Sequence, residues 1–232
     1  MGSASVGWRW RAVYNDGEEG PPFFLSYAHA TEGQIGTAIT AGVGEHVEKF
    51  FKDLAVNVRH LVHLPAGVPA GFMDQEMRGG MDWTDELIHA VGTCQVLVAM
   101  LSAEYLTAPW CRMEWHGFAQ RQVRQRPGAK PSPRQGCIIP VIWAPFHETL
   151  PKHMKNTVFF SPDREPEPRT PDHYKSNGVF GLMRMKRLRN SYEIVTWQLA
   201  LHIAHIIHSQ QTEYREFQHA DLIVPPGDDD DG

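Results

Sequence analysis

The chain has 232 residues, of which 42% are hydrophobic and 21% charged, and its formal net charge is −5. This length suits one domain with extensions at its ends, and the apolar content is sufficient for a full hydrophobic core. The negative charge argues against general affinity for nucleic acids or anionic membranes, and we expect neither a signal peptide nor a membrane span, because no apolar run nears the roughly 18 residues that cross a bilayer.

The first elements in chain order are a short strand, a loop and a long helix. Residues 1–20 are predicted to be an N-terminal extension, and residues 23–27 (FFLSY) a short buried strand. Four glycines between Ala28 and Gly44 predict a long, pliable loop. From residue 47 to residue 62 the apolar side chains follow the 3.6-residue period, which predicts an amphipathic helix with a polar outer face.

A second strand and a second helix follow, joined by a glycine-containing loop. Residues 71–74 (GFMD) are predicted to form the strand, and Gln75–Trp83 the loop, with Gly79 and Gly80 as its hinge. Thr84 is a typical N-cap residue, so we expect a helix from there through Val91.

The most informative stretch begins with a third strand, the apolar run at residues 95–100, which Ser102 is expected to end. Thr107 is predicted to cap the next helix, with Pro109 in its first turn. From Trp110 onward this helix follows the carboxyl end of a strand, where open α/β sheets bind their ligands.

Trp110, Glu114 and Phe118 recur at i, i+4 and i+8 and therefore share one face of that helix. A carboxylate beside an indole can hold a sugar while the ring stacks on a flat group. The alternative is a surface glutamate next to a core tryptophan, and spacing alone favours that alternative.

The second half of the chain continues the alternation of strand and helix. Its predicted segments are a basic, Pro-rich connector (124–134), a fourth strand (137–143), a short fifth strand (157–160), a Pro-rich charged loop (161–172), a nearly all-apolar helix (191–210) and an acidic tail (211–232). Pro140 lacks an N–H, which predicts a missing or bulged neighbour at the fourth strand. The alternation predicts a doubly wound parallel sheet of about five strands in one domain, residues 21–210.

Histidines and cysteines invite a metal interpretation that their spacing does not favour. His202, His205 and His208 recur at i, i+3 and i+6 without a carboxylate, so we expect them to line a packed helix face. The three cysteines are odd in number and lack metal-ligand spacing; they are Cys94, Cys111 and Cys137. Their expected state is reduced, which suits a soluble cytoplasmic protein without a metal site.

A basic cluster precedes the last helix and consists of Arg184, Lys186, Arg187 and Arg189. We interpret it as a solvated connection or a protein contact, because nucleic-acid binding needs more charge or interleaved aromatic residues. The sequence also lacks the glycine-rich phosphate-binding motifs of P-loop and dinucleotide-binding domains.

Taken in order, these motifs resemble those of TIR domains. Residues 23–30 (FFLSYAHA) resemble the first TIR box, and residues 72–83 (FMDQEMRGGMDW) resemble the second box and its loop. Residues 97–115 (LVAMLSAEYLTAPWCRMEW) resemble the next segment, and the strand at residues 138–143 (IIPVIW) also fits the family pattern. The resemblance covers roughly residues 21–210 and implies a flavodoxin-like three-layer fold with a roughly five-stranded parallel sheet. The FFKDL helix and the stretch YKSNGVFGLMRMKRLRNSYEIV look most like actinobacterial TIR-like proteins of the FxsC type.

Many TIR domains cleave NAD+ between nicotinamide and ribose through a glutamate four residues after a tryptophan, and Glu114 and Trp110 match that pair. The resemblance therefore implies an NAD+ glycohydrolase or ADP-ribose cyclase in defence or signalling, with NAD+ as substrate and no separate cofactor. It implies substrate contacts from Trp110, Tyr27, Ala28, His29, Asp74, Glu76 and Ser102, and loop closure or assembly through Arg78, Gly79, Gly80 and Trp83. Ala28 departs from the polar or basic residue that enzymatic members often have there, for which His29 could compensate.

Two other functions stay open. TIR domains also act as non-catalytic adaptors that self-associate, here through the loop and helix after the second strand, and an activating partner protein is expected in either case. A glycosyl-transferring enzyme that acts on nucleosides is the third alternative. The WCRMEW segment favours NAD+ cleavage over the adaptor, and the GGMDW loop disfavours the third function. For the enzyme, we expect an ionised Glu114 near the helix N-terminus that lines a cleft together with Trp110 and Tyr27.

Overall fold

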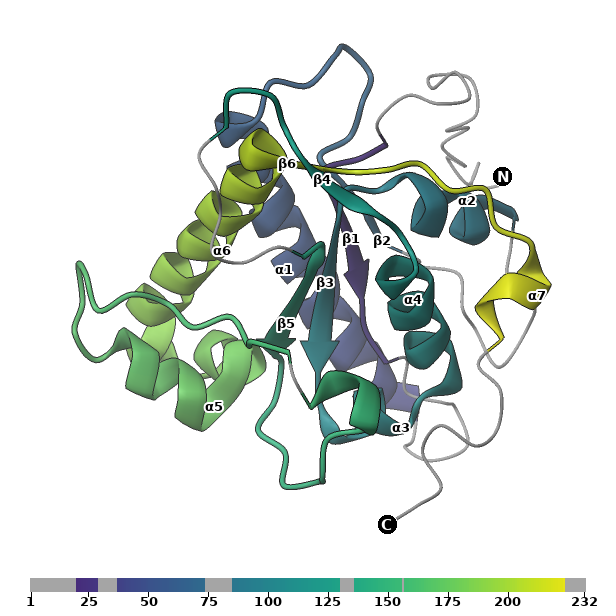
Figure 1. The fold of residues 1–232 in the computed structure, drawn as a ribbon. Coiled ribbons are helices and arrows are strands. Elements are labelled where there is room, and N and C mark those ends of the chain that lie inside the picture. The colour runs from purple at the N-terminus through teal and green to yellow at the C-terminus, as the bar shows by residue number, and fades with distance from the viewer. Residues whose placement is uncertain (1–19, 29–36, 74–84, 130–135, 156, 224–232) are drawn as a thin grey trace, which may run out of the picture.

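The computed structural model describes residues 20–28, 37–73, 85–129, 136–155 and 157–223 (Figure 1). The expected N-terminal extension, the loop after the second strand with its cap Thr84, and the end of the acidic tail lie outside the described residues. These predictions therefore stay predictions.

Four parallel strands form the central sheet in the order β2-β1-β3-β5. They are β1 (Phe23–Ser26), β2 (Gly71–Met73), β3 (Val96–Leu101) and β5 (Ile138–Ile142). In the register of the inner pair, Phe24 lies opposite Leu97 and Ser26 opposite Ala99. The order reverses between β1 and β3, as it does in flavodoxin-like sheets, and this confirms the predicted fold class.

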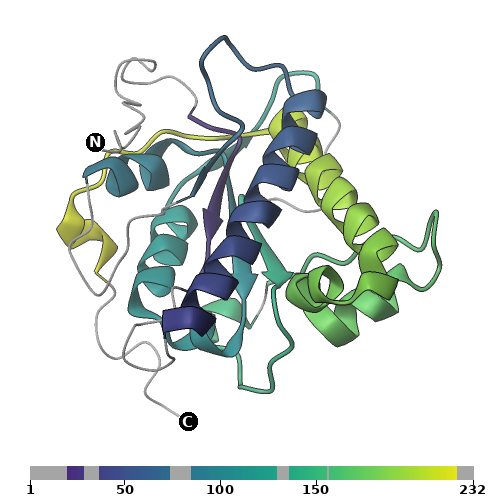
Figure 2. The same ribbon diagram turned by 180° about the vertical axis from the view of Figure 1, so that it is seen from behind.

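Helices cover both faces of the sheet and make three layers (Figures 1 and 2). One face carries α1 (Thr37–Leu61), α5 (Thr170–Arg184) and α6 (Arg189–Ser209), and the other carries α2 (Asp85–Thr93), α3 (Ala103–Thr107), α4 (Pro109–Ala119) and α7 (His219–Leu222). Alternate residues of β1 supply the two cores, since Phe23 and Leu25 pack toward α1 and α6 while Phe24 packs toward α4.

Helix α1 starts earlier than predicted. It begins at Thr37, so the expected loop from Ala28 to Gly44 is wrong over its second part, and Gly44 lies inside the helix. Each helical glycine costs about 1 kcal/mol relative to alanine. Packing offsets this cost, because Val47, Phe50 and Leu54 are buried against the sheet further along the same helix.

The capping prediction at Thr107 is also wrong, because an additional short helix precedes α4. Ser102 caps this helix, α3, by accepting a hydrogen bond of 3.2 Å from the backbone N–H of Tyr105. Thr107 is the last residue of α3, and its hydroxyl donates to the carbonyl of Glu104. Ala108 is the N-cap of α4 without a side-chain hydrogen bond, and Pro109 occupies the first turn as predicted.

The predicted fifth strand at residues 157–160 does not form, and Pro140 gives the physical reason. β5 is an edge strand, as Pro140 indicated, and the carbonyl of this proline accepts a hydrogen bond of 2.9 Å from the N–H of Phe160. Pro140 has no N–H to return. The next outward N–H, that of Ile142, donates to the hydroxyl of Tyr174 at 2.7 Å, so a continuous ladder cannot extend along this edge.

Two short strands that the sequence did not indicate form a separate antiparallel pair, β4 (Val123–Gln125) and β6 (Gln210–Thr212). β4 lies at the start of the predicted connector. The pair sits at the amino end of the central sheet, opposite to the end where α3 lies (Figure 1). Two 3₁₀ turns, Lys152–Met154 and Lys186–Leu188, complete the described elements.

Helix α5 was not predicted and contains an internal break at Gly178. This residue has φ 61° and ψ 177°, a conformation that is essentially confined to glycine. A Cβ atom there would lie 2.4 Å from the carbonyl oxygen of Trp143. The break lets the N–H of Phe180 donate to that same carbonyl, which fastens α5 to the end of β5.

Candidate functional site

A buried carboxylate is the centre of the candidate site. Glu114 projects from α4 and is only 3% exposed. The hydroxyl of Ser26, the last residue of β1, donates a hydrogen bond to its Oε2 atom. The hydroxyl of Tyr105 in α3 lies 2.9 Å from the hydroxyl oxygen of Ser26. Side chains from β1 and from the two consecutive helices α3 and α4 therefore gather in one cluster around the carboxylate.

The position of this cluster is the one at which open α/β sheets bind ligands. Ser26 ends β1, and α3 follows directly after β3, so the cluster lies at the carboxyl ends of the two central strands. The strand order reverses between these two strands. A topological switch point of this kind leaves a crevice outside the strand ends in doubly wound folds.

The titratable neighbours of Glu114 favour a single negative charge in the cluster. Burial raises the pKa of the Cys111 thiol well above its usual value, and the charge of Glu114 raises it further. Burial likewise raises the pKa of the Tyr105 phenol, with Cys111 and Glu114 acting in the same direction. Both groups therefore stay protonated near neutral pH, and the phenol remains a hydrogen-bond donor.

The expected cleft shared by Glu114, Trp110 and Tyr27 needs a correction. Tyr27 packs against the core on the α1 side of the sheet, whereas Glu114 lies on the α4 side with Ser26. Strand alternation explains this, because neighbouring residues of a strand point to opposite faces. Ala28 packs on the same side as Glu114, in agreement with the same alternation.

Trp110 and Ser102 lie near the cluster with different local roles. Trp110 is half-buried against the α4-side core, and its indole Nε1 is buried without a hydrogen-bond partner within the described residues. Ser102 is 6% exposed, and its hydroxyl is engaged as the cap of α3. The remaining predicted site residues lie outside the described residues; they are His29, Asp74, Glu76, Arg78, Gly79, Gly80 and Trp83.

Sequence reasoning missed Ser26 and Tyr105. A usable signal existed for Ser26, because it is the one polar side chain that β1 directs to the α4 side, between Phe24 and Ala28. Tyr105 carried no such signal, since α3 was not predicted as a separate helix.

A family model described as TIR domain matches residues 52–169, just over half of the chain. The chain belongs to the TIR domain family. Comparison with curated proteins and with solved structures gives no match. TIR domains include members that cleave NAD+ and members that are non-catalytic, and they commonly self-associate. The match includes Trp110 and Glu114 but begins after the first box, which contains Ser26.

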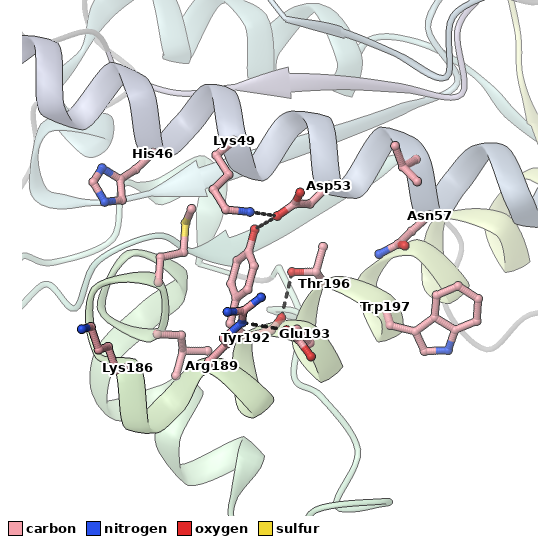
Figure 3. Close-up of a pocket in the computed structure, with 13 residues that line it drawn as sticks. His46, Lys49, Asp53, Asn57, Lys186, Arg189, Tyr192, Glu193, Thr196 and Trp197 are labelled. Carbon is pink, nitrogen blue, oxygen red and sulfur yellow. Dashed lines mark hydrogen bonds and ion pairs between the residues drawn. The ribbon is translucent and has the colours of Figure 1, made fainter.

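A concave region of this TIR domain lies on the face of the sheet opposite to Glu114, between α1 and the helices α5 and α6 (Figure 3). It is a groove of about 650 Å³. Tyr192 bridges it, because its hydroxyl donates to Asp53 at 2.6 Å and Lys49 contacts the same carboxylate oxygen at 2.5 Å. Since Tyr192 of α6 and Lys49 of α1 both bind the Asp53 carboxylate, we interpret this cluster as a structural contact, a tie that joins α1 to α6.

Replacing Tyr192 with Phe is expected to lower the free energy of unfolding by about 1–2 kcal/mol, because a hydrogen bond to a charged partner is lost from a side chain that is 7% exposed. Denaturant unfolding measures the difference. Lys52→Ala, which removes the exposed pair with Glu48, is the control and should cost less than about 0.5 kcal/mol. Equal losses in the two variants would contradict the tie.

The histidines of α6 do not line a packed face, contrary to expectation. His202 is half-buried, but His205 and His208 are exposed, together with Trp197 and Leu201 on the outer side of the helix. Within the described parts of the chain, no three His, Cys, Asp or Glu side chains gather closely enough to hold a metal ion. Cys94, Cys111 and Cys137 are all free and buried.

The basic cluster surrounds the 3₁₀ turn that leads into α6. Arg184, Lys186 and Arg187 are exposed there, and Arg189 pairs with Glu193 at 3.0 Å. This exposed setting agrees with the solvated interpretation. None of the helices in the described ranges combines the length and apolar character that crossing a membrane requires.

Proposed function

We propose that this TIR domain cleaves the bond between nicotinamide and ribose in NAD+, with Glu114 as the catalytic residue. The observation that carries the proposal is the position of the Glu114 carboxylate, which the Ser26 hydroxyl holds at the switch point between β1 and β3. Family membership and the tryptophan four residues before this glutamate support it.

The chemistry follows from the charge that develops on the ribose. When the glycosidic bond breaks, its electron pair leaves with neutral nicotinamide, and the ribose becomes oxocarbenium-like at C1. A carboxylate close to C1 and the ribose hydroxyls stabilises that positive charge, and a site with little water strengthens the interaction. Water then forms the new bond to C1 and releases a proton, which yields ADP-ribose. In a cyclase, a nitrogen of the adenine takes the place of water.

Trp110 is proposed to bind the substrate by stacking on the nicotinamide or adenine ring. Its indole N–H lacks a partner within the described residues, so an oxygen of the bound ligand could accept it. Contacts from Ala28, His29, Asp74 and Glu76 remain part of the proposal. We further propose a role in bacterial defence or signalling in the cytoplasm, where three buried free thiols would stay reduced.

The test is incubation of the purified protein with NAD+, followed by chromatographic separation of nicotinamide, ADP-ribose and cyclic ADP-ribose. Release of nicotinamide in equal amount to either ribose product supports the proposal. Unchanged NAD+ at the highest protein concentration contradicts it.

The second candidate is an adaptor that acts by self-association. One specific observation favours it: Glu114 is 3% exposed and already engaged by Ser26, as a purely structural residue would be. A protein that forms defined oligomers yet leaves NAD+ intact would be this adaptor.

Turnover per subunit is expected to rise with protein concentration, because we propose that the segment with Gly79, Gly80 and Trp83 docks against a neighbouring subunit. A subunit that binds the active state of its neighbour more tightly shifts the population toward that state. Nicotinamide release at a series of protein concentrations, with the oligomeric state measured alongside, tests this. A constant rate per subunit would argue against assembly, as would full activity in Gly80→Pro.

A further inference from the structure

Two hydroxyl groups form a buried line that ends on the Glu114 carboxylate. Ser26 and Tyr105 are each 1% exposed, so water does not compete for their hydrogen bonds. The direction of the line follows from proton count. An ionised carboxylate only accepts, so Ser26 uses its one hydrogen for Glu114, and Tyr105 must then donate to the serine oxygen at 2.9 Å.

Tyr105 is itself held in place by contacts other than its hydrogen bond with Ser26. Its backbone N–H donates to the Ser102 hydroxyl, which caps α3, and its ring is part of the α4-side core. It belongs to a different helix from Glu114, and the hydrogen-bond path that joins them runs through Ser26 of β1. A serine hydroxyl rotates freely by itself. A donor fixed on one side of the oxygen leaves the serine hydrogen pointing at the carboxylate.

We propose that Tyr105 is a positioning residue that acts on Glu114 through Ser26. By donating to the serine oxygen, it orients the serine hydroxyl and so fixes the carboxylate in the direction of the bound ribose. The inference rests on the proposed function, since the oriented group is the proposed catalytic carboxylate. Among the described titratable groups, the phenol of Tyr105 and the neighbouring thiol of Cys111 both interact with Glu114, and the Cys111 thiol also contacts Ser26.

The first experiment compares NAD+ cleavage in Tyr105→Phe and in the wild type. The variant keeps the ring and removes the hydroxyl, so kcat should fall roughly five- to tenfold, the effect of one hydrogen bond, with little change in KM. Donors stabilise the ionised carboxylate, so their loss should also move the acid limb of the pH–rate profile to higher pH. An acid limb that stays in place would overturn the proposal.

The matched control is Tyr174→Phe. Tyr174 is equally buried, at 2%, and its hydroxyl also holds one hydrogen bond, from the N–H of Ile142. It packs on the α1 side of the sheet, away from Glu114. Its loss should lower the melting temperature and leave the pH profile unchanged. The same profile shift in both variants would assign the Tyr105 effect to stability alone and overturn the proposal.

A double variant tests whether the effect passes through Ser26. In a Ser26→Ala background the intermediate oxygen is absent, so adding Tyr105→Phe should lower kcat no further. A full five- to tenfold loss in that background would show that Tyr105 acts by another route and would contradict the proposal.

A measurement that does not depend on activity separates this inference from the proposed function. The carboxyl carbon of Glu114 can be titrated by NMR in glutamate-labelled wild type, Tyr105→Phe and Ser26→Ala, with Glu114→Gln to assign the signal. The pKa of Glu114 should be higher in both variants than in the wild type. If NAD+ is not cleaved but this shift occurs, the proposed function fails and the hydrogen-bond line stands. If the pKa of Glu114 is the same in the wild type and in both variants, the two hydroxyl groups do not act on the carboxylate, and the proposal is overturned even if the enzyme is active.

Discussion

Exchange of Glu114 for Gln is expected to lower nicotinamide release from NAD+ by roughly 10²–10³-fold while the protein stays folded. Glutamine keeps the size of the side chain and an oxygen that can accept from the Ser26 hydroxyl. It lacks the negative charge that stabilises an oxocarbenium-like ribose. Chromatographic measurement of nicotinamide, with melting temperatures recorded in parallel, separates loss of chemistry from loss of fold.

Glu104→Gln is the matched control for this prediction. Glu104 lies on α3, one helix before Glu114, but it is exposed, so its neutralisation should change stability by less than about 0.5 kcal/mol and leave turnover unchanged. Equal release by wild type and Glu114→Gln would exclude Glu114 as the catalytic residue. Release by neither protein would favour the adaptor.

The central strands could be predicted from the sequence because the sheet is buried on both faces. Residues 95–100 predicted a strand that the structure has at Val96–Leu101, and residues 137–143 predicted one at Ile138–Ile142. Parallel strands covered by helices on both sides are continuous apolar runs, so their sequence signal is local. Pro140 adds local information of another kind, since the missing N–H indicated an edge.

Elements that depend on distant partners left no local signal. β4 (VRQ) and β6 (QQT) are three residues each with a single apolar side chain between them, and they pair across more than 80 positions of the chain, with Val123 opposite Thr212. α5 is interrupted at Gly178, where the backbone fits the carbonyl of Trp143, so no continuous helical period runs through it. In both cases tertiary contacts determine the structure, and propensity does not.

The expected cleft of Glu114, Trp110 and Tyr27 was wrong at Tyr27, which follows β1 and packs on the other side of the sheet. The spacing of Trp110 and Glu114 placed both on one helix face, but it could not show which side of β1 that face meets. The choice of Tyr27 followed the motif, whereas the period of two selects Ser26 and Ala28 for the α4 side. The hydroxyls that surround the carboxylate thus come from alternation and from α3, neither of which the motif describes.

Arg121 carries the largest expected effect on stability. It follows α4, is 6% exposed, and donates to the carbonyls of Val91, Cys94, Thr212 and Glu213. These contacts join the end of α2 to the start of the C-terminal segment after α6. Burial lowers the pKa of Arg121 to about 10, so the guanidinium remains charged at neutral pH and every donor stays available.

Arg121→Met is therefore expected to lower the free energy of unfolding by about 2–4 kcal/mol, because methionine fills similar space but leaves buried carbonyls without their donor. For a protein of this size the melting temperature should fall by roughly 10 °C. Arg124→Met is the control, since Arg124 is 69% exposed and pairs with the side chain of Glu213 at the surface, which is worth at most about 1 kcal/mol. Calorimetry of both variants gives the two melting temperatures to be compared. Because Arg121 lies toward the amino end of β3, away from Glu114, the NAD+ cleavage rate of the folded fraction should not change. Similar melting temperatures for Arg121→Met and Arg124→Met would show that the buried guanidinium does not hold these segments together.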